Sequence, residues 1–484
     1  MSNVKKNIFY NMGYQILILI VPFITSPYVS RVLGPEGVGT YSVTTSIVKY
    51  FSMFAALGMS NYGNRLISKA RDNKKNLSVT FCNLFYFQML TSGFCIALYV
   101  LYYVFIGQES YGLVSLCQTP YIAAAFFEIS WFFYGLENFK FMVVRNAVVK
   151  VATTVCIFIF VKNASDVWSY VLINALSLLV GQLCMWPFLL KEIKWTAPHW
   201  DIIKQHFKPN MILFVSVVAV SVYTLMDKIM IEWMSNTSEV GYYENGEKLF
   251  NLGCNLVGSI GAVMLPRMTY LMEKKDIANV SSVLNKSMKY MVAFSLALSF
   301  GLIGISDQFC VIFFGKEFAQ SGVVLAVLSI AIVFYAWENI LRTEYLLPSG
   351  RDKIFVIGTM IAAVVNLFLN SILIPSFGAV GAAVGTVAAQ IAEASYQSFS
   401  VRRELPVLNY IGGTIPFFII SLIMCICCKI IGNVFGTSFF VVICQIIFGG
   451  VVFCLFSVIV LVRQQDPFLL DIRNHIKKHF KRNH

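Results

Sequence analysis

Charged residues are scarce in this chain of 484 residues: Asp, Glu, Lys and Arg together make up 13%, whereas hydrophobic residues make up 58%. A soluble globular domain carries roughly a quarter of its residues as charges, so this composition excludes a soluble globule with a polar surface. No polar stretch is long enough to form a separate soluble domain. The sequence therefore predicts an all-α polytopic membrane protein, because helices satisfy their own backbone hydrogen bonds in lipid.

Histidine is also rare, and the 12 cysteines follow no regular spacing. The cysteine spacing indicates neither a disulfide framework nor a zinc site. The five histidines all fall in segments that we expect to lie on the cytoplasmic side: His199, His206, His475, His479 and His484. The chain has no Gly-x-x-x-x-Gly-Lys-Ser/Thr loop for nucleotide hydrolysis. We therefore expect no metal, no cofactor and no direct coupling to ATP.

Apolar runs long enough to cross a bilayer recur from one end of the chain to the other. We expect about fourteen spans, close to residues 8–30, 41–64, 79–106, 111–135, 141–161, 166–190, 211–234, 241–265, 286–306, 322–346, 354–375, 379–400, 410–431 and 438–462. The ninth and tenth are the least distinct, because Phe309–Phe314 fits a loop, a re-entrant piece or the start of a span.

The order of these spans predicts five successive parts of the chain. They are an N-terminal six-helix bundle (1–190), a cytoplasmic amphipathic linker (191–210), a C-terminal six-helix bundle (211–405), two additional transmembrane helices (406–462) and a basic cytoplasmic tail (463–484). The linker carries Trp200, Ile203 and Phe207 on one helical face, and we expect it to lie along the membrane surface.

Most of the 37 Lys and Arg residues fall in alternate loops between the predicted spans. Cytoplasmic loops collect such residues, so the pattern predicts that both termini are cytoplasmic. The net charge of +13 then faces the anionic lipid of the inner leaflet, which makes nucleic acid an unnecessary partner.

Four lysines, in contrast, lie within predicted spans. Burying charge in lipid is expensive, so these residues are expected to line a wet space. Three of them, Lys49, Lys150 and Lys248, share a helical face with polar residues at spacings of three or four, as Lys49 does with Thr45 and Lys150 with Asn146. Lysine suits a mobile phosphate-bearing substrate because it is a compact charge on a flexible stem. The candidate substrate-binding residues are Lys49, Lys150, Lys228, Lys248, Arg31, Asn251, Asn255 and Gln15.

A structural alternative stays open for two of these lysines, since Glu244 lies within helical reach of Lys248, and Asp227 or Glu232 within reach of Lys228. Carboxylates within or near spans are either sites for a coupling ion or proton, or ion-pair partners, as Glu338 would be for Arg342. The candidates for ion coupling are Asp227, Glu244, Glu128, Glu338 and Glu393. Glu393 shares a helical face with Gln390 and Gln397, which helix packing explains at least as well as transport.

The motif Val-Gly-x-Tyr occurs twice, beginning at Val38 and at Val240, 202 residues apart. Each copy lies between two predicted spans, and a lysine follows further along the next helix. Recurrence at matching places predicts two pseudo-symmetric six-helix bundles around a central hydrophilic cavity, an arrangement that permits alternating access. A related glycine turn, Phe377–Ala383, joins the eleventh and twelfth spans.

Two stretches near the N-terminus, Arg31–Ser42 and Leu57–Arg65, resemble the opening of the Wzx-type polysaccharide flippases of the multidrug/oligosaccharidyl-lipid/polysaccharide exporter superfamily. Later stretches that support the likeness are Asp227-Lys228, Glu239–Tyr243 with Lys248, Pro348–Arg351 and Asn366–Gly381. The resemblance implies translocation of undecaprenyl-diphosphate-linked oligosaccharide repeat units from the inner to the outer leaflet of the bacterial cytoplasmic membrane. These units would serve O-antigen, capsule or exopolysaccharide assembly. The expected partners are the lipid-linked oligosaccharide, membrane lipids, and the polymerase and other polysaccharide-assembly proteins.

Two other functions remain as alternatives at this point. The first is efflux of small cationic drugs, which related multidrug exporters perform; a cation-filled cavity would repel such substrates, but the sequence does not settle the sign of its potential. The second is a membrane enzyme such as a polysaccharide polymerase, which would need a long outer loop with catalytic residues. Every predicted outer loop is short, so we expect a transporter and not an enzyme.

Overall fold

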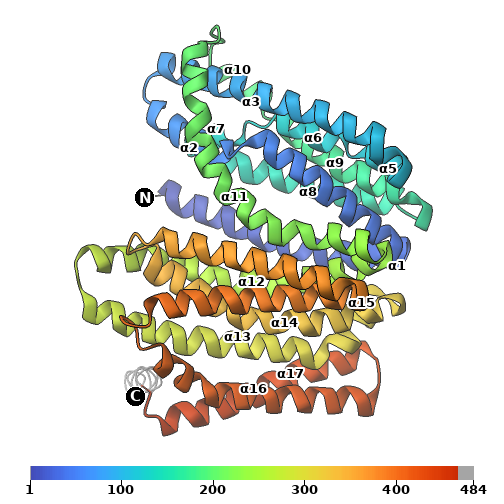
Figure 1. The fold of residues 1–484 in the computed structure, drawn as a ribbon, viewed down its shortest axis with the longest axis vertical. Helices are drawn as coiled ribbons and strands as arrows, with labels where there is room; N and C mark the ends of the chain where they lie inside the picture. Colours follow the sequence, from blue (N-terminus) through green and yellow to red (C-terminus); the bar gives the residue numbers. More distant parts are fainter. Residues whose placement is uncertain (1, 467–484) are drawn as a thin grey trace. The chain divides into compact units, whose positions relative to one another are not determined.

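The computed structural model describes residues 2–466, and every regular element in that range is a helix (Figure 1). Residues 467–484, most of the predicted basic tail, lie outside the described residues. Ten segments of the described chain are long and apolar enough to cross a membrane. The structure thus shows an all-helical polytopic membrane protein. Its contacts group the chain into two compact units, residues 1–244 and 245–484.

Unit 1 begins with one long helix and continues through shorter ones. Its elements are α1 Ser2–Ala56, α2 Met59–Ala70, α3 Lys74–Tyr102, η1 Tyr103–Gly107, α4 Gln108–Tyr111, α5 Leu113–Cys117, α6 Thr119–Phe126, α7 Ser130–Gly135, α8 Phe139–Phe160, η2 Ala164–Asp166, α9 Val167–Leu183, α10 Trp186–Glu192 and α11 Trp200–Met234. The first turns of α12 (Thr237–Glu273) complete the unit.

The first predicted span and most of the second join into α1 through a kink at Gly34, the residue where α1 departs from helical geometry (φ 68°, ψ 179°). The second span, 41–64, is broken after Ala56, and its last residues belong to α2. This conformation is essentially restricted to glycine, because a Cβ atom would clash with the backbone. Pro35 follows at once, and proline is favoured at the first position of a helix because its φ is already helical. The pair Gly34-Pro35 therefore ends one helix and begins the next.

The fourth predicted span, 111–135, is not one continuous helix but the short helices α4 to α7. The break between α6 and α7 leaves backbone carbonyls without helical partners, and lipid offers none. Gln88 of α3 supplies the hydrogen-bond donor that these carbonyls need: its Nε2 donates to the carbonyl oxygens of Ala125 at 2.9 Å and Glu128 at 2.8 Å. The Trp131 indole in turn donates to Gln88 Oε1 at 3.0 Å. The broken span is thus held by one buried amide.

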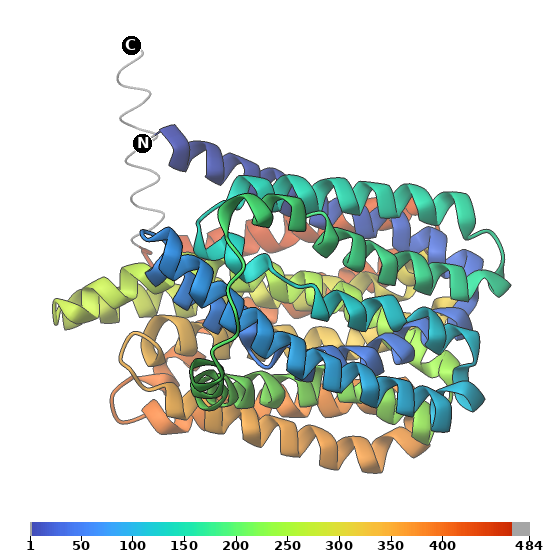
Figure 2. The same cartoon turned by 90° about the horizontal axis from the view of Figure 1, so that it is seen from above.

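Unit 2 consists of the rest of α12 and the remaining helices, several of which run side by side (Figures 1 and 2). Its elements are α13 Ile277–Phe314, η3 Lys316–Phe318, α14 Ala319–Ile340, η4 Leu341–Leu346, α15 Asp352–Val401, α16 Val407–Phe435 and α17 Phe439–Arg463. Helix α13 packs against α14, α16 and α17, and α14 packs against α15. The segment Phe309–Phe314 is the last part of α13, so it belongs to a helix and not to a loop.

The eleventh and twelfth predicted spans form the two halves of α15, which is kinked at Gly378 (φ 52°, ψ −129°). The expected glycine turn is therefore a sharp bend inside one element. Close packing at this bend also requires Gly381, where a Cβ atom would lie 2.5 Å from the carbonyl oxygen of Leu373. The bend lets Thr359 in the first half donate to Glu393 in the second at 2.9 Å.

The predicted amphipathic linker is only partly helical. Residues 193–199 form no regular element, and α11 then runs from Trp200 through the seventh predicted span without a break. Ile203 is buried, whereas Trp200 and Phe207 are more than half exposed. These three side chains line one apolar groove on unit 1.

Candidate cationic cavity

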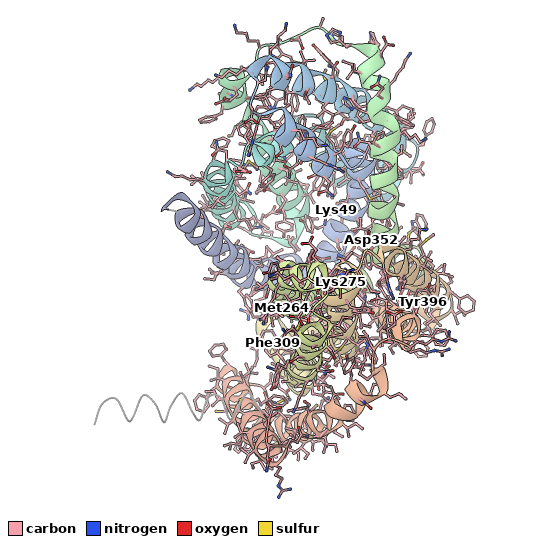
Figure 3. The ribbon with its side chains drawn as sticks, turned by 90° about the vertical axis from the view of Figure 1, so that its left-hand side faces the viewer. Lys49, Met264, Lys275, Phe309, Asp352 and Tyr396 are labelled. Carbon is pink, nitrogen blue, oxygen red and sulfur yellow. The ribbon has the colours of Figure 1, made fainter. Side chains whose placement is uncertain are left out.

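Unit 1 contains a cavity of about 440 Å³ between α1, α6, α8 and α9. Three cationic side chains line it: Lys49 from α1, and Arg145 and Lys150 from α8 (Lys49 is labelled in Figure 3). No aspartate or glutamate is among the described residues of its wall. The other polar residues of the wall are Tyr41, Thr45, Gln118, Tyr121, Asn146, Thr153, Asn174, Ser177 and Gln182. The cavity is therefore positively charged and rich in hydroxyl and amide groups.

Helical periodicity explains why Lys49 and Lys150 face the same space. Thr45 and Lys49 are four residues apart on α1, and Asn146 and Lys150 are four apart on α8, so each pair lies on one face of its helix. The structure places both faces on the cavity. Sequence reasoning assigned each lysine to a polar face, and tertiary packing brings the faces together.

Arg145 is the cationic residue of the cavity that the sequence analysis did not single out. Its Nη1 donates to the carbonyl oxygen of Gly181 on α9 at 2.7 Å. Arg145 comes five residues before Lys150, about 140° around an ideal helix, so it does not share the polar face of Lys150. Its position near the start of α8 resembled that of an ordinary cytoplasmic anchor. Only its long side chain and the closeness of α9 bring its charge to the cavity.

Gln118 holds the wall of the cavity in place from the start of α6. Its Nε2 donates to Thr44 Oγ1 at 3.2 Å and to Thr45 Oγ1 at 3.0 Å. The rings of Tyr41 and Tyr170 pack with their centroids 4.6 Å apart. These contacts join α1 to α6 and α9, so the lining side chains are anchored on rigid helices.

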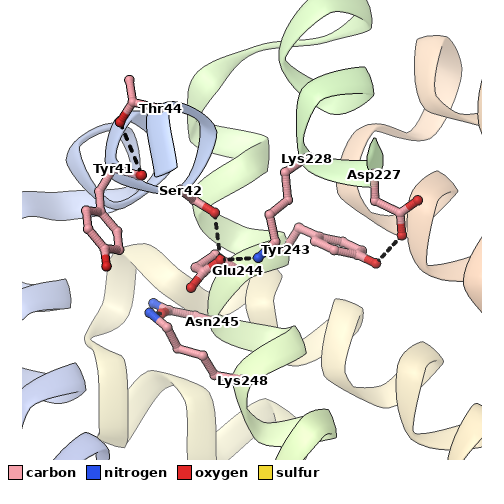
Figure 4. A network of polar contacts seen from close by, with 9 residues as sticks. All are labelled: Tyr41, Ser42, Thr44, Asp227, Lys228, Tyr243, Glu244, Asn245 and Lys248. Atoms are coloured by element: carbon pink, nitrogen blue, oxygen red, sulfur yellow. Dashed lines mark hydrogen bonds and ion pairs between the residues drawn. The ribbon is translucent and has the colours of Figure 1, made fainter. Parts of the chain in front are cut away.

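Lys228 lies in a different environment, a buried ion pair (Figure 4). Its Nζ lies 2.6 Å from Glu244 Oε2, and Ser42 Oγ donates to the same oxygen at 2.6 Å. Tyr243 donates its hydroxyl to Asp227 Oδ2 at 2.6 Å. Lys228 and Asp227 are 8% and 1% exposed. The sequence offered Asp227 or Glu232 as partners for Lys228; the structure adds Glu244, and this buried ion pair favours a structural role for the lysine.

The two Val-Gly-x-Tyr motifs meet in unit 1. A Cβ atom added to Gly39 would lie 1.9 Å from the carbonyl oxygen of Thr237, and one added to Gly241 would lie 2.1 Å from that of Pro35. The contacts are reciprocal, because Pro35 and Thr237 are 202 residues apart, as are Gly39 and Gly241. Reciprocal contacts of this kind are the mark of a twofold axis. The motifs therefore cross as a local pseudo-twofold pair.

The remaining candidate binding residues are not among the described lining residues of this cavity. Lys248 Nζ donates to Asn245 Oδ1 at 3.3 Å in unit 2. Asn251 and Asn255 are exposed on α12, and Arg31 is exposed just before the kink of α1. The side chain of Gln15 lies outside the described residues.

The carboxylates proposed for ion coupling are likewise dispersed. Glu128 accepts a hydrogen bond from Ser130 at 2.7 Å at the break before α7. Glu338 and Glu393 are buried in unit 2, and the Glu338–Arg342 pair expected from the sequence is present at 3.6 Å. Among the described residues, no group of three or more His, Cys, Asp or Glu side chains is placed to hold a metal ion.

Residues 4–272, more than half of the chain, match the family described as "Polysaccharide biosynthesis protein". The chain belongs to this family. A protein of Shigella dysenteriae named "Putative O-antigen transporter" is 22% identical to this polysaccharide biosynthesis protein over 390 residues. The match covers 80% of this chain and 97% of the Shigella protein. The expected relationship to polysaccharide flippases is thus confirmed at the level of the family.

Solved structures show which fold this polysaccharide biosynthesis protein has. One described as "Lipid II flippase MurJ, inward closed conformation" superposes with a TM-score of 0.74 and 18% identity, and covers 94% of this chain and 99% of that one. An inward-facing multidrug resistance MATE family transporter of the MOP superfamily superposes with a TM-score of 0.61 and 14% identity, and covers 81% and 94%. The fold is that of the MOP superfamily, and these three relatives are named as transporters or flippases and not as enzymes.

Proposed function

We propose that this protein translocates undecaprenyl-diphosphate-linked oligosaccharide repeat units from the inner to the outer leaflet of the bacterial cytoplasmic membrane. The observation that carries the proposal is the cavity of unit 1, where Lys49, Arg145 and Lys150 meet with no carboxylate among the described lining residues. Such a space attracts an anion and repels a cation.

The chemistry of the wall suits a diphosphate joined to sugars. Lysine and arginine are the side chains that bind phosphate oxygens, lysine as a point charge and arginine through its planar fork. The amides of Gln118 and Asn174 and the hydroxyl of Thr45 match the hydroxyl groups of a sugar. The volume, about 440 Å³, falls in the range of small-molecule pockets. It accommodates a headgroup and leaves the lipid tail outside.

A place for the lipid tail exists on the same unit. An apolar groove of about 850 Å³ lies between α1, α3 and α11. Its wall includes Phe54, Phe94, Trp200 and Phe214. Phe54 follows Lys49 by five residues on α1, about 7.5 Å along the helix axis. Phe54 also lies about 140° around α1 from Lys49, so a polyprenyl chain in this groove would pass around the helix from a diphosphate held at Lys49. An apolar groove this near to the cationic cavity supports a lipid-linked substrate over a free sugar.

We further infer that transport proceeds by alternating access between two six-helix bundles, in a chain of about fourteen spans with both termini cytoplasmic. In this proposal the bundles, their linker and the two additional helices keep the boundaries predicted from the sequence. The local pseudo-twofold crossing of the Val-Gly-x-Tyr motifs, at Gly39 and Gly241, supports an internal repeat. The charge alternation of the loops supports the orientation.

Efflux of cationic drugs, the function of related multidrug exporters, is the second candidate. The positive charge of the cavity in unit 1 argues against it, because such a cavity repels cations. The sequence left that sign open, whereas the structure gathers three cations and no described carboxylate in the wall. Polymerisation is the less favoured alternative, because the relatives of this chain are named as transporters or flippases.

The test is transbilayer movement of a fluorescent undecaprenyl-diphosphate oligosaccharide in liposomes that contain the purified protein. Lys49→Ala, Arg145→Ala and Lys150→Ala should each slow movement by about tenfold or more, since a hydrogen bond to a charged group contributes about 1.5–3 kcal/mol. Lys162→Ala is the matched control, because Lys162 is an exposed loop lysine outside the cavity wall. Thermal unfolding verifies that each variant is folded. Unchanged movement in all three cavity variants, or transport of a cationic dye but not of the lipid by wild type, would contradict the proposal.

A further inference from the structure

Two buried carboxylates lie close together in unit 2, away from the cationic cavity of unit 1. Glu338 comes from the end of α14 and Glu393 from the second half of α15, two helices that pack against each other. Each residue is only 3% exposed. Carboxylates are almost never buried to this extent unless their charge is compensated.

Gln397 links the two carboxylates. Its Nε2 donates to Glu393 Oε1 at 3.4 Å, and its amide also interacts with Glu338. Thr359 donates a second hydrogen bond to Glu393 Oε1 at 2.9 Å. Arg342 lies on the other side, with its Nε 3.6 Å from Glu338 Oε1. These five side chains form a compact polar cluster within unit 2.

The charges of this cluster do not balance when both carboxylates are ionised. Among the described charged groups, those that act on either carboxylate are the other carboxylate and the Arg342 guanidinium. Two negative charges and one positive charge leave a buried net charge of −1, which is costly in a low-dielectric interior. One added proton makes the cluster neutral.

Other titratable groups pack against the cluster but supply no positive charge. They are Cys254 of α12 and Tyr335 of α14, which both lie within electrostatic reach of Glu338. Glu344 of η4 is also buried, and it lies beside Ser287 of α13. A cysteine, a tyrosine and a third carboxyl group do not offset the excess negative charge.

The unsatisfied atoms of the cluster point to the same missing group. Glu338 Oε1 and Gln397 Oε1 are buried oxygens with no hydrogen-bond partner among the described residues. The Gln397 amide is held at the carboxylates by its Nε2, so its oxygen lies within the cluster. Both atoms are acceptors, and buried acceptors without a donor are rare in native proteins. A proton on a carboxyl oxygen would supply the absent donor.

We propose that Glu338 and Glu393 together hold one exchangeable proton and that this proton couples transport to the transmembrane proton gradient. Two neighbouring carboxylates share a proton because both cannot remain ionised at short range. The cluster takes the proton from water on one side of the membrane and releases it on the other. No covalent bond to the substrate is made or broken. The inference rests on the proposed flippase function and names its energy source.

The experiment uses the full-length protein in liposomes with the fluorescent diphosphate lipid. It compares the distribution of this lipid between the two leaflets at steady state, with and without a pH gradient. If one proton is exchanged for one lipid, a gradient of one pH unit changes the equilibrium ratio of lipid between the leaflets by about tenfold. Wild type should accumulate the lipid in one leaflet by up to about that factor. Glu338→Gln and Glu393→Gln should equalise the leaflets while still moving the lipid down its own gradient.

Glu317→Gln is the matched control, since Glu317 is an exposed carboxylate of η3 in the same unit. It should accumulate the lipid as wild type does. Movement without a pH gradient tests the flippase function, and accumulation under the gradient tests the coupling proton, so the two can fail separately. Accumulation that persists in both glutamine variants, or that follows a sodium gradient instead of a pH gradient, would overturn the inference.

A second measurement does not depend on transport. A shared proton gives the infrared carbonyl band of a protonated carboxylic acid at neutral pH. The band should be present in wild type and in Glu317→Gln, and its difference spectra against Glu338→Gln and Glu393→Gln should show its loss. A wild-type spectrum identical to those of both variants in this region would also overturn the inference.

Discussion

Replacing Gly39 by alanine probes the crossing of the two Val-Gly-x-Tyr motifs. The new Cβ atom would lie 1.9 Å from the carbonyl oxygen of Thr237 and 2.9 Å from its carbonyl carbon. Carbon and oxygen atoms in close contact are normally about 3.3 Å or more apart, so the two backbones would have to separate by about 1.4 Å.

The size of the effect follows from what surrounds Gly39. The two nearest obstructing atoms belong to the Thr237 backbone and the third, Thr237 Cγ2, lies at 3.0 Å, so rotating a side chain does not relieve the clash. The reciprocal contact of Gly241 with Pro35, where a Cβ atom would lie 2.1 Å from the carbonyl oxygen, fixes the crossing on its other side. Overpacking of a rigid site costs about 1–3 kcal/mol and occasionally more. We expect Gly39→Ala to lower the free energy of unfolding by about 3 kcal/mol, the upper end of that range.

Thermal unfolding of the purified protein in detergent, followed by tryptophan fluorescence, measures this loss. A change of this size corresponds to a Tm lower by on the order of 10 °C in a unit of about 250 residues. Gly93→Ala is the control: it lies within α3, where a Cβ atom would meet nothing within 4 Å. Its Tm should be equal to or slightly above that of wild type, because alanine is the better helix former. A Gly39→Ala variant that unfolds within about 2 °C of wild type would refute the described crossing.

Two further predictions concern ion pairs. Lys228→Met should lower the free energy of unfolding by about 3–5 kcal/mol, because it removes the cation that lies 2.6 Å from the buried Glu244 carboxylate. Adding Glu244→Met should restore most of the loss in chemical denaturation. Outside the spans, Arg351 lies 2.7 Å from Glu404 and lowers the pKa of that carboxyl group. The resulting stabilisation is present above the unfolded pKa of about 4.3 and is lost as the pH falls through the lower folded value. Between about pH 6 and pH 3, the Tm of Glu404→Gln should therefore fall by less than the Tm of wild type. An equal fall in both proteins would argue against the Arg351–Glu404 ion pair.

Composition and periodicity were sufficient to predict the helical membrane architecture and the polar faces of Lys49 and Lys150. Both properties are local, because lipid requires long apolar helices and the helical repeat places residues four apart on one face. The glycine bends at Gly34 and Gly378 were also visible as motifs, although the sequence did not show that each lies within one nearly continuous element.

Tertiary contacts account for what the sequence did not predict. Lys228 pairs with Glu244, 16 residues away on the next helix, a partner that the spacing within α11 does not indicate. Arg145 reaches the cavity from a flank of α8 because α9 offers the carbonyl oxygen of Gly181. The break of the fourth span depends on Gln88 of α3. In each case the deciding partner lies on another helix, where no periodic pattern indicates it.

The crossing of the two motifs also bears on how this chain can be diversified. At each glycine an added Cβ atom would lie closest to a backbone carbonyl of the other copy, at Thr237 or Pro35, so the clash would arise whichever side chain these two residues carried. In a library of random variants, the two glycines should therefore tolerate the fewest replacements. Gly39 and Gly241 are the two codons to hold constant, and they should be held as a pair.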